Sequence, residues 1–212
     1  MKLSVICSGG GATVQYAVRV WQQAGRPLDL MMITDRKCQA EDVAAELSLR
    51  HERIAEKDAT AFSKRAYQMC NDENIGACLL LFSRMVTADL FGKMQVFNIH
   101  PSLLPEYPGF KAVERAYSAK HGRLGATLHK VDETMDGGEI VAQLGHPMNH
   151  SIGLDDWLRV SFSQKVYLTL LWFEMTLGYC ANEVPQLSVE LERLFSCFVM
   201  SEAIEWQVQQ KV

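Results

Sequence analysis

The sequence lacks the features that mark several large classes of protein. None of its six cysteines belongs to a C-x-x-C pair, so nothing indicates a structural zinc site or a disulfide framework. No apolar run is long enough to span a membrane, and the first run, after Met1-Lys2, ends at Ser8 and is too short for a signal peptide. We therefore expect reduced thiols, a cytoplasmic location and no membrane partner. The cysteines are Cys7, Cys38, Cys70, Cys78, Cys180 and Cys197.

An excess of charge of one sign is also missing. The net charge is −4 over 212 residues, and acidic and basic residues are interspersed. Without a basic stripe the chain cannot release many counterions from a nucleic-acid backbone, so nucleic acid is not an expected partner. The length and the ordinary composition suit one domain with its own core, and we expect residues 1–212 to form a single domain.

Apolar runs alternate with amphipathic segments along the first half of the chain. The expected strands are Leu3–Cys7, Leu28–Ile33, Arg53–Ala55, Gly76–Phe82 and Val96–Ile99. The expected helices begin after Gly11 and at Gln39, Thr60 and Ala88. This alternation predicts an α/β fold with a Rossmann-like, mostly parallel twisted sheet and helices on both faces.

The pattern changes after His100. A short helix is expected over Val113–Ala119, and two β-like runs over Ala126–Val131 and Glu139–Leu144. A long helix over Leu154–Leu177 is rich in large apolar residues at helical spacing, which is typical of a helix packed across a sheet rather than of a cofactor site. Its core residues include Trp157, Trp172 and Phe173, and Leu187, Leu191 and Leu194 suggest one more helix.

A glycine-rich turn follows the first expected strand and opens the first helix. Its residues are Gly9, Gly10, Gly11, Ala12 and Thr13. Backbone N–H groups at a helix N-terminus can bind an anion such as a phosphate. The turn is neither a dinucleotide G-x-G-x-x-G nor a P-loop, and tight packing alone would also explain its glycines. Both interpretations stay open at this point.

Three polar residues point to chemistry at the carboxyl end of the sheet. Asn98 and His100 lie two positions apart on one strand, so their side chains are expected on one face. Asp136 precedes Gly137-Gly138, a turn that allows a carboxylate to approach from another loop, although such a turn is also common without any function. An amide, an imidazole and a nearby carboxylate that favours the charged imidazolium can stabilise an oxyanion and move protons.

Other constellations are weaker. Ser102 and His100 lack the G-x-S-x-G elbow of a serine hydrolase. His146 and His150 are separated by Pro147 and have no accompanying ligand cluster, so no metal site is expected.

Two stretches give the chain a resemblance to a known family. One reads Asn98-Ile99-His100-Pro101-Ser102-Leu103-Leu104-Pro105, and the other reads Asp132-Glu133-Thr134-Met135-Asp136-Gly137-Gly138. In order and content they resemble the folate-dependent formyltransferases, and within that family the enzymes that formylate glycinamide ribonucleotide in purine biosynthesis. The resemblance implies a formyltransferase fold, 10-formyltetrahydrofolate as the donor, a small-molecule amine as the acceptor and no metal. It leaves open whether the protein is a monomer or a homodimer.

The resemblance also implies roles for individual residues. Asn98 and a protonated His100 would hold the oxyanion of the tetrahedral adduct, and Asp136 would keep His100 charged and assist proton transfer to the departing folate nitrogen. His129 matches a family histidine near the reaction centre. The implied folate site contains Arg84, Met85, Val86, Val96, Phe97, Val131, Asp132, Glu133, Thr134 and Met135, and the implied acceptor site contains Gly9, Gly10, Gly11, Ala12, Thr13 and Gln164. Residues 1–95 would then hold the first β-α units, 96–180 the catalytic and folate-binding half, and 181–212 a tail without an assigned role.

Two departures from the family pattern fall on the acceptor side. The phosphate loop of the purine enzymes reads like S-G-x-G-S-N, whereas this chain has Ser8-Gly9-Gly10-Gly11-Ala12-Thr13. A family glutamate aligns with Gln164, which is followed by Lys165. The acceptor could therefore be another amine, such as an amino sugar. A formyltetrahydrofolate hydrolase and an inactive folate-binding module are further alternatives; the hydrolase is less expected because this chain begins directly at its first strand.

Overall fold

A computed structural model describes residues 1–179 and 186–197 of the protein and shows one seven-stranded sheet. The strands are β1 (Lys2–Cys7), β2 (Leu30–Thr34), β3 (Arg50–Arg53), β4 (Ile75–Leu81), β5 (Gln95–His100), β6 (Arg123–Lys130) and β7 (Ile140–Pro147). Their order is β3-β2-β1-β4-β5-β6-β7, with parallel pairing from β3 to β5 and antiparallel pairing from β5 to β7. The Rossmann-like, mostly parallel sheet expected from the sequence is confirmed.

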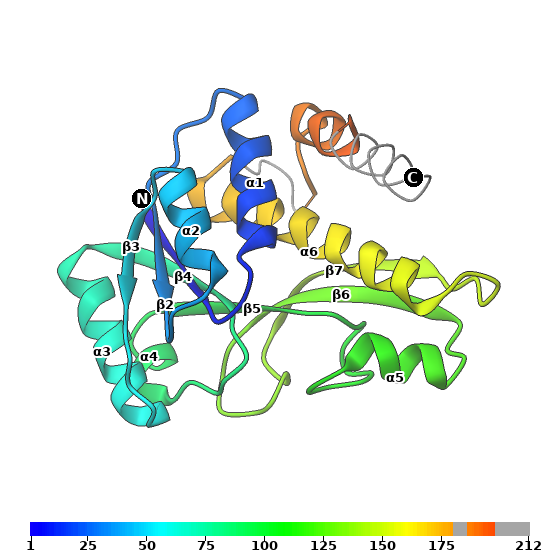
Figure 1. Ribbon diagram of the computed structural model, residues 1–212, viewed down its shortest axis with the longest axis horizontal. Coiled ribbons are helices and arrows are strands. Elements are labelled where there is room, and N and C mark those ends of the chain that lie inside the picture. The colour runs from blue at the N-terminus through cyan, green and yellow to red at the C-terminus, as the bar shows by residue number, and fades with distance from the viewer. Residues whose placement is uncertain (180–185, 198–212) are drawn as a thin grey trace.

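Helices cover both faces of this sheet (Figure 1). They are α1 (Ala12–Gln23), α2 (Gln39–Glu46), α3 (Ala59–Asp72), α4 (Ala88–Phe91), α5 (Ala112–Ser118) and α6 (Leu154–Leu177), and residues 189–197 form a further helix. One apolar core joins α1, α2 and α6 to the sheet, and a second joins α3 and α4 to its other face. A small third cluster, with Val113, Leu124 and Trp157, connects α5 to β6 and α6.

The strand sequences explain this two-sided packing. In β1, Leu3 and Val5 point into the core under α1, while Ile6 points into the core under α3. Because successive side chains of a strand alternate between faces, a strand covered on both sides reads as a continuous apolar run. The apolar runs in the sequence are therefore the central strands of the sheet.

The long helix α6 lies across one face of the sheet, as expected, and its bounds coincide with those predicted. Trp172 and Phe173 are fully buried there, and Trp157 is buried near its beginning. Trp172 and Phe173 thus belong to the first core, whereas Trp157 belongs to the small third cluster. None of the described helices combines the length and the apolar composition that crossing a bilayer requires.

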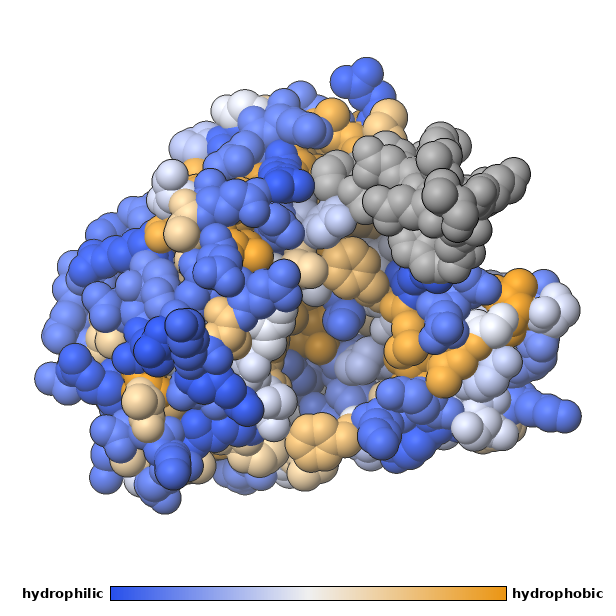
Figure 2. Space-filling model, viewed as in Figure 1, coloured by the Kyte–Doolittle hydropathy of each residue, from blue (hydrophilic) through white to orange (hydrophobic). Residues whose placement is uncertain are grey.

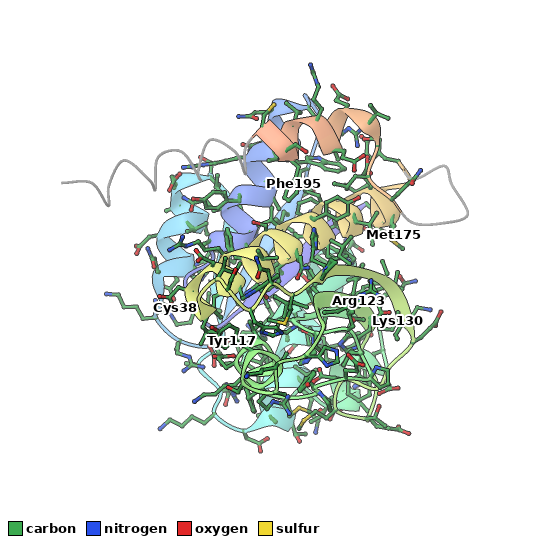
Figure 3. The ribbon with its side chains drawn as sticks, turned by 90° about the vertical axis from the view of Figure 1, so that its right-hand side faces the viewer. Cys38, Tyr117, Arg123, Lys130, Met175 and Phe195 are labelled. Atoms are coloured by element: carbon green, nitrogen blue, oxygen red, sulfur yellow. The ribbon has the colours of Figure 1, made fainter. Side chains whose placement is uncertain are left out.

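The segment over residues 186–197 packs on the layer formed by α1 and α6. Glu174 of α6 is fully buried and accepts hydrogen bonds from Arg26 Nη1 at 2.6 Å and from the Ser188 backbone N–H at 2.8 Å. Phe195 packs edge-on against Tyr167 with ring centroids 5.5 Å apart, and Figure 3 shows it between the last helix and that layer. This helix therefore covers the core. The expectations for Cys180 and for the rest of the tail lie outside the described residues.

Candidate active site

A cavity of about 610 Å³ lies at the carboxyl ends of β1, β4 and β5. The strand order reverses between β1 and β4, because the chain proceeds outward from β1 in one direction and from β4 in the other. Open α/β sheets bind ligands in the crevice at such a point. The hollow near the centre of the face in Figure 2 is the opening of this cavity.

Asn98, His100 and Asp136 line this cavity together. His100 Nδ1 lies 3.2 Å from Asp136 Oδ2, and Asn98 Nδ2 donates to Asp136 Oδ1 at 3.4 Å. Asn98 and His100 share one face of β5 because they are two residues apart. The loop after β6 brings Asp136 to them from the other side. The sequence thus predicts the meeting of these three side chains, and the structure places them in one cavity.

The turn that carries Asp136 has little freedom. Asp136 itself has a left-handed φ of 54°. A Cβ atom on Gly138 would lie 1.9 Å from the carbonyl oxygen of Lys130, so only glycine fits there. The turn is thereby pressed against the end of β6, and this close approach fixes where the carboxylate enters the cavity.

A loop between β5 and α5 holds both His100 and Asp136. His100 Nε2 donates to the carbonyl oxygen of Tyr107 at 2.9 Å, and the Gly109 backbone N–H donates to Asp136 Oδ2 at 2.7 Å. Arg115 of α5 in turn donates to the Pro108 carbonyl and lies over the Tyr107 ring. The pair is therefore positioned by main-chain groups that α5 holds in place. Nothing in the sequence marked Tyr107 or Arg115 for this role.

His129 is a direct partner of Asn98 across the antiparallel strands. The two residues are paired in the β5–β6 register, and Asn98 Nδ2 lies 3.1 Å from His129 Nε2. His129 Nδ1 donates to the Lys130 carbonyl at 2.9 Å, which leaves Nε2 as an acceptor for the Asn98 amide. Burial lowers the pKa of His129, although the Lys130 carbonyl and the Asp136 charge oppose the shift. His129 therefore sits in the site as a neutral imidazole.

The glycine-rich turn lines the same cavity and also packs against α2. Gly11 has a φ of 73°, and a Cβ atom there would lie 2.9 Å from Ala40 Cα. The Gly9 carbonyl accepts the Ala40 N–H at 3.1 Å. No side chain caps the N-terminus of α1, and its first turn has no acidic residue. The turn thus has a packing function, and its exposed N–H end also remains able to bind an anion.

The segment over Arg84, Met85 and Val86 forms another wall. The guanidinium of Arg84 is turned away and donates to the carbonyls of Glu56 at 3.0 Å and Lys57 at 2.6 Å. This segment can therefore offer a ligand its main chain and the exposed Met85 side chain, but not the Arg84 guanidinium.

The opposite wall comes from the loop after β6. Four of the residues expected in the folate site line the cavity from this loop, namely Val131, Asp132, Thr134 and Met135. Three large apolar side chains stand exposed at the cavity, namely Met85 (52%), Phe110 (71%) and Met135 (54%). Exposed apolar groups gathered at one opening are typical of a binding site for a partly apolar ligand.

Four expected site residues do not reach the cavity. Val96 and Phe97 are buried in the two cores on either side of β5. Glu133 is exposed at the tip of its loop and does not line the cavity. Gln164 is buried, and its Nε2 contacts His146 Nδ1 at 3.1 Å. Successive residues of a helix point about 100° apart. The rotation of α6 about its axis therefore directs Gln164 away from the cavity and Lys165 into it.

Several lining residues were not singled out in the sequence. Ser8 accepts the Ser83 N–H at 2.8 Å and joins the ends of β1 and β4. Phe162 and Lys165 enter from α6 at a spacing of one helical turn. This spacing could have indicated a shared face, but not which face. The lining residues that were not among the expected site residues include Ser8, Ser83, Gly109, Phe110, Lys111 and Phe162.

The arrangement has the groups that acyl-type transfer requires. An amide donor, an imidazole and a carboxylate surround one space and can stabilise an oxyanion and transfer a proton. In the part of the chain that the structure describes, no three His, Cys, Asp or Glu side chains are grouped in a way that could hold a metal ion.

Comparisons with known proteins agree with a site for acyl-type transfer. The sequence pattern of the formyl transferase family matches residues 1–154. The trifunctional purine biosynthetic protein adenosine-3 of Drosophila melanogaster is 27% identical over 203 residues, which span 90% of this chain and 14% of that protein. The phosphoribosylglycinamide formyltransferase of Bacillus subtilis is 53% identical over 49 residues, which span 23% of this chain and 25% of that protein. The matched regions are thus less than a third of each relative's length.

Solved structures give a more complete overlap. The phosphoribosylglycinamide formyltransferase of Bacillus halodurans superposes with a TM-score of 0.76 at 25% identity, over 88% of this chain and all of that one. The glycinamide ribonucleotide transformylase 1 of Geobacillus kaustophilus gives a TM-score of 0.76 at 27% identity, over 84% of this chain and 98% of that one.

Proposed function

Because this chain belongs to the formyl transferase family, we propose that it transfers the formyl group of 10-formyltetrahydrofolate to the amine of glycinamide ribonucleotide. The observation that carries the proposal is the meeting of Asn98, His100 and Asp136 around one cavity, with contacts of 3.2 and 3.4 Å. The names of the solved neighbours with the same fold support the acceptor.

The first chemical step is attack of the amine nitrogen on the formyl carbon. A C–N bond forms, the carbonyl oxygen takes on negative charge, and a donor must meet that charge. Asn98 Nδ2 makes contacts of 3.1 Å to His129 and 3.4 Å to Asp136. The longer contact is the one that the developing oxyanion replaces. His129, as a neutral acceptor, takes one N–H of the Asn98 amide and so holds the other N–H turned toward the site.

The second step breaks the bond between the formyl carbon and the folate nitrogen, which leaves with a proton. Asp136 accepts the proton that the attacking amine loses and returns it to the departing nitrogen, directly or through a water molecule. His100 stays beside the carboxylate because its other nitrogen is bound to the Tyr107 carbonyl. His100 Nδ1, which faces the carboxylate, is the ring nitrogen that would also donate to the reacting oxygen and stabilise its charge.

The two substrates would enter from different sides. The folate would lie along the main chain of Arg84–Val86 and the loop from Val131 to Met135, with Met85, Phe110 and Met135 at its apolar surface. The acceptor phosphate would lie at the N–H groups of the Gly9–Thr13 turn. The reacting carbonyl would then lie between these two sites, next to Asn98.

An acceptor assay tests the proposal. With 10-formyltetrahydrofolate alone, the purified protein is expected to release no folate. When glycinamide ribonucleotide is added, it is expected to release folate and to formylate the amine. Asp136→Asn is expected to bind the donor normally and to turn over far more slowly, while the matched change Asp72→Asn at the exposed end of α3 is without effect. Folate release without amine would indicate a hydrolase, and donor binding without release would indicate an inactive module. Either result would overturn the proposal.

A further inference from the structure

The cavity wall that leads from β4 to α4 has unpaired main-chain groups at its centre. Within residues 1–179 and 186–197, neither Met85 nor Val86 makes a main-chain hydrogen bond, and both line the cavity. The chain is tied down on either side of them. The Ser83 N–H is bound at the end of β1 at 2.8 Å, and the Thr87 N–H donates to Oγ of the buried Ser63 at 2.9 Å. Main-chain groups without a partner call for one, so the position of this stretch matters to a ligand.

The side chain of Arg84 anchors this stretch to the connection between β3 and α3. Its Nη1 donates to the Glu56 carbonyl at 3.0 Å, and its Nη2 donates to the Lys57 carbonyl at 2.6 Å. Its Cζ lies 5.2 Å from the ring centroid of Phe62, which is fully buried in α3. A guanidinium presents its donors in one rigid plane, so these contacts fix the orientation of Arg84 as well as its place.

A buried carboxylate holds this guanidinium from behind. Asp35 follows β2 directly, and its side chain is only 3% exposed. Arg84 Nη1 donates to Asp35 Oδ2 at 3.3 Å, while Arg36 donates to both carboxylate oxygens, each at 3.0 Å. A buried carboxylate is stable only when it is paired and hydrogen-bonded, and two guanidiniums meet that need here. Asp35 therefore lies behind the cavity wall and not among the residues that line the cavity.

The place of Asp35 in the sheet would suit a different role in a related fold. An acidic residue after the second strand binds ribose hydroxyls in dinucleotide-binding sheets. Here the guanidiniums of Arg36 and Arg84 already engage both oxygens of the carboxylate. Arg36 Nη2 also donates to Ser83 Oγ at 3.3 Å, so both guanidiniums reach the same stretch of chain. The arrangement is thus suited to holding the chain rather than to binding a ribose.

We propose that the side chains of Asp35 and Arg84 act as a positioning pair for the formyl donor, by holding the main chain of residues 84–86 where the folate binds. This inference rests on the proposed function and identifies what sets the affinity for the donor. A ligand binds more tightly to groups that are already ordered, because their ordering does not then oppose binding. Without the pair, the main-chain donors and acceptors of this wall remain but lose the support that directs them.

Two variants test the pair by removing one member each. Arg84→Met leaves Asp35 its second guanidinium, and Asp35→Asn leaves Arg84 its two carbonyl partners, so both variants are expected to fold. We expect each to raise the KM for 10-formyltetrahydrofolate about 3- to 30-fold, the range for residues that act on a site without contacting its ligand. The acceptor KM and kcat should stay unchanged, because the hydrogen bonds of the pair do not reach Asn98, His100 or Asp136.

Further variants separate this role from a general loss of stability. Arg65→Met and Asp72→Asn are the matched controls, because both residues are exposed on α3. Arg84→Lys keeps the charge but lacks the planar group that reaches two carbonyls at once, so an intermediate donor KM is expected. In the double variant of Asp35→Asn with Arg84→Met the two losses should not multiply, because residues in one contact are coupled. Multiplied losses would show independent effects and would overturn the inference.

Binding of tetrahydrofolate, measured by calorimetry, tests the pair without turnover. Weaker binding in Arg84→Met and Asp35→Asn than in wild type would support the inference even if no amine is formylated, in which case the proposed function alone fails. A lowered melting temperature with unchanged donor KM and unchanged tetrahydrofolate binding would overturn the inference and leave the proposed function intact. Equal rises in the donor and acceptor KM would also contradict it, and a wild type that binds no tetrahydrofolate would overturn both proposals.

Discussion

His100 Nδ1 and Asp136 Oδ2 lie 3.2 Å apart although they come from the end of β5 and from the loop that follows β6. The contact depends on two turns that keep the chain close to this pair. One presses Gly138 against the end of β6, and the other directs the Tyr107 carbonyl and the Gly109 N–H at the pair. The site is therefore built as much from main-chain geometry as from its own side chains.

Asn98→Ala is expected to lower kcat by about two to three orders of magnitude, the typical effect of removing one oxyanion donor. The donor and acceptor KM values should change little, because the amide matters most when negative charge develops. Steady-state kinetics with both substrates measure this. Asn71→Ala at the exposed end of α3 serves as control. A rise in KM at unchanged kcat would show that Asn98 binds substrate rather than the transition state.

Arg115→Met is expected to reduce kcat by about 10- to 100-fold without contact to either substrate, because a small displacement of catalytic groups has effects of that size. The loop that Arg115 holds carries the partners of both His100 and Asp136. The pH profile of kcat should shift in this variant, whereas the exposed-surface control Arg65→Met should match wild type. An unchanged pH profile together with a lowered melting temperature would show that Arg115 contributes to stability alone.

His129 gives the fold a specific sensitivity to acid. Burial lowers its folded-state pKa below the usual 6.5. Above that pH the residue is neutral in both states, but below it the unfolded chain takes up the proton first. Stability is therefore lost as the pH falls from 6.5 toward the folded pKa. We expect the free energy of unfolding of wild type to fall more steeply over this interval than that of His129→Gln. Parallel urea-denaturation curves at each pH would contradict the assignment of a neutral His129.

Two glycines of the same turn should respond differently to alanine. Gly11→Ala places a side chain at a left-handed φ and against Ala40, and should lower the free energy of unfolding by at least about 1–2 kcal/mol. Gly9→Ala meets no atom within 4 Å and should leave stability within about 0.5 kcal/mol. Chemical denaturation measures both. Similar losses for the two variants would mean that the turn is not held as the structure shows.

The sequence indicated the central strands and α6 well, because buried strands and a long apolar helix leave strong patterns. β3 was expected at Arg53–Ala55 and lies at Arg50–Arg53 instead. It is an edge strand with mostly exposed side chains, so no apolar pattern marks it. The shared position of Asn98 and His100 was also predictable, since period-2 geometry places their side chains on one face of β5.

What could not be predicted depends on how elements are rotated and paired. Whether Gln164 or Lys165 faces the cavity is decided by the rotation of α6 about its axis, which the packing of Phe162 on Tyr16 fixes. The pairing of His129 with Asn98 depends on the β5–β6 register. Both are set by contacts distant in sequence, and a single chain without its partners does not reveal them.

The buried contact between Arg26 and Glu174 gives α6 a fixed anchor at its far end. Because a helix is stiff along its axis, a contact that fixes its last turns also limits how far its earlier turns can move relative to the sheet. Ser188 completes this brace from the segment that follows α6. The position of Lys165 opposite the glycine-rich turn is thus maintained partly from the other end of the helix, by residues that do not line the cavity.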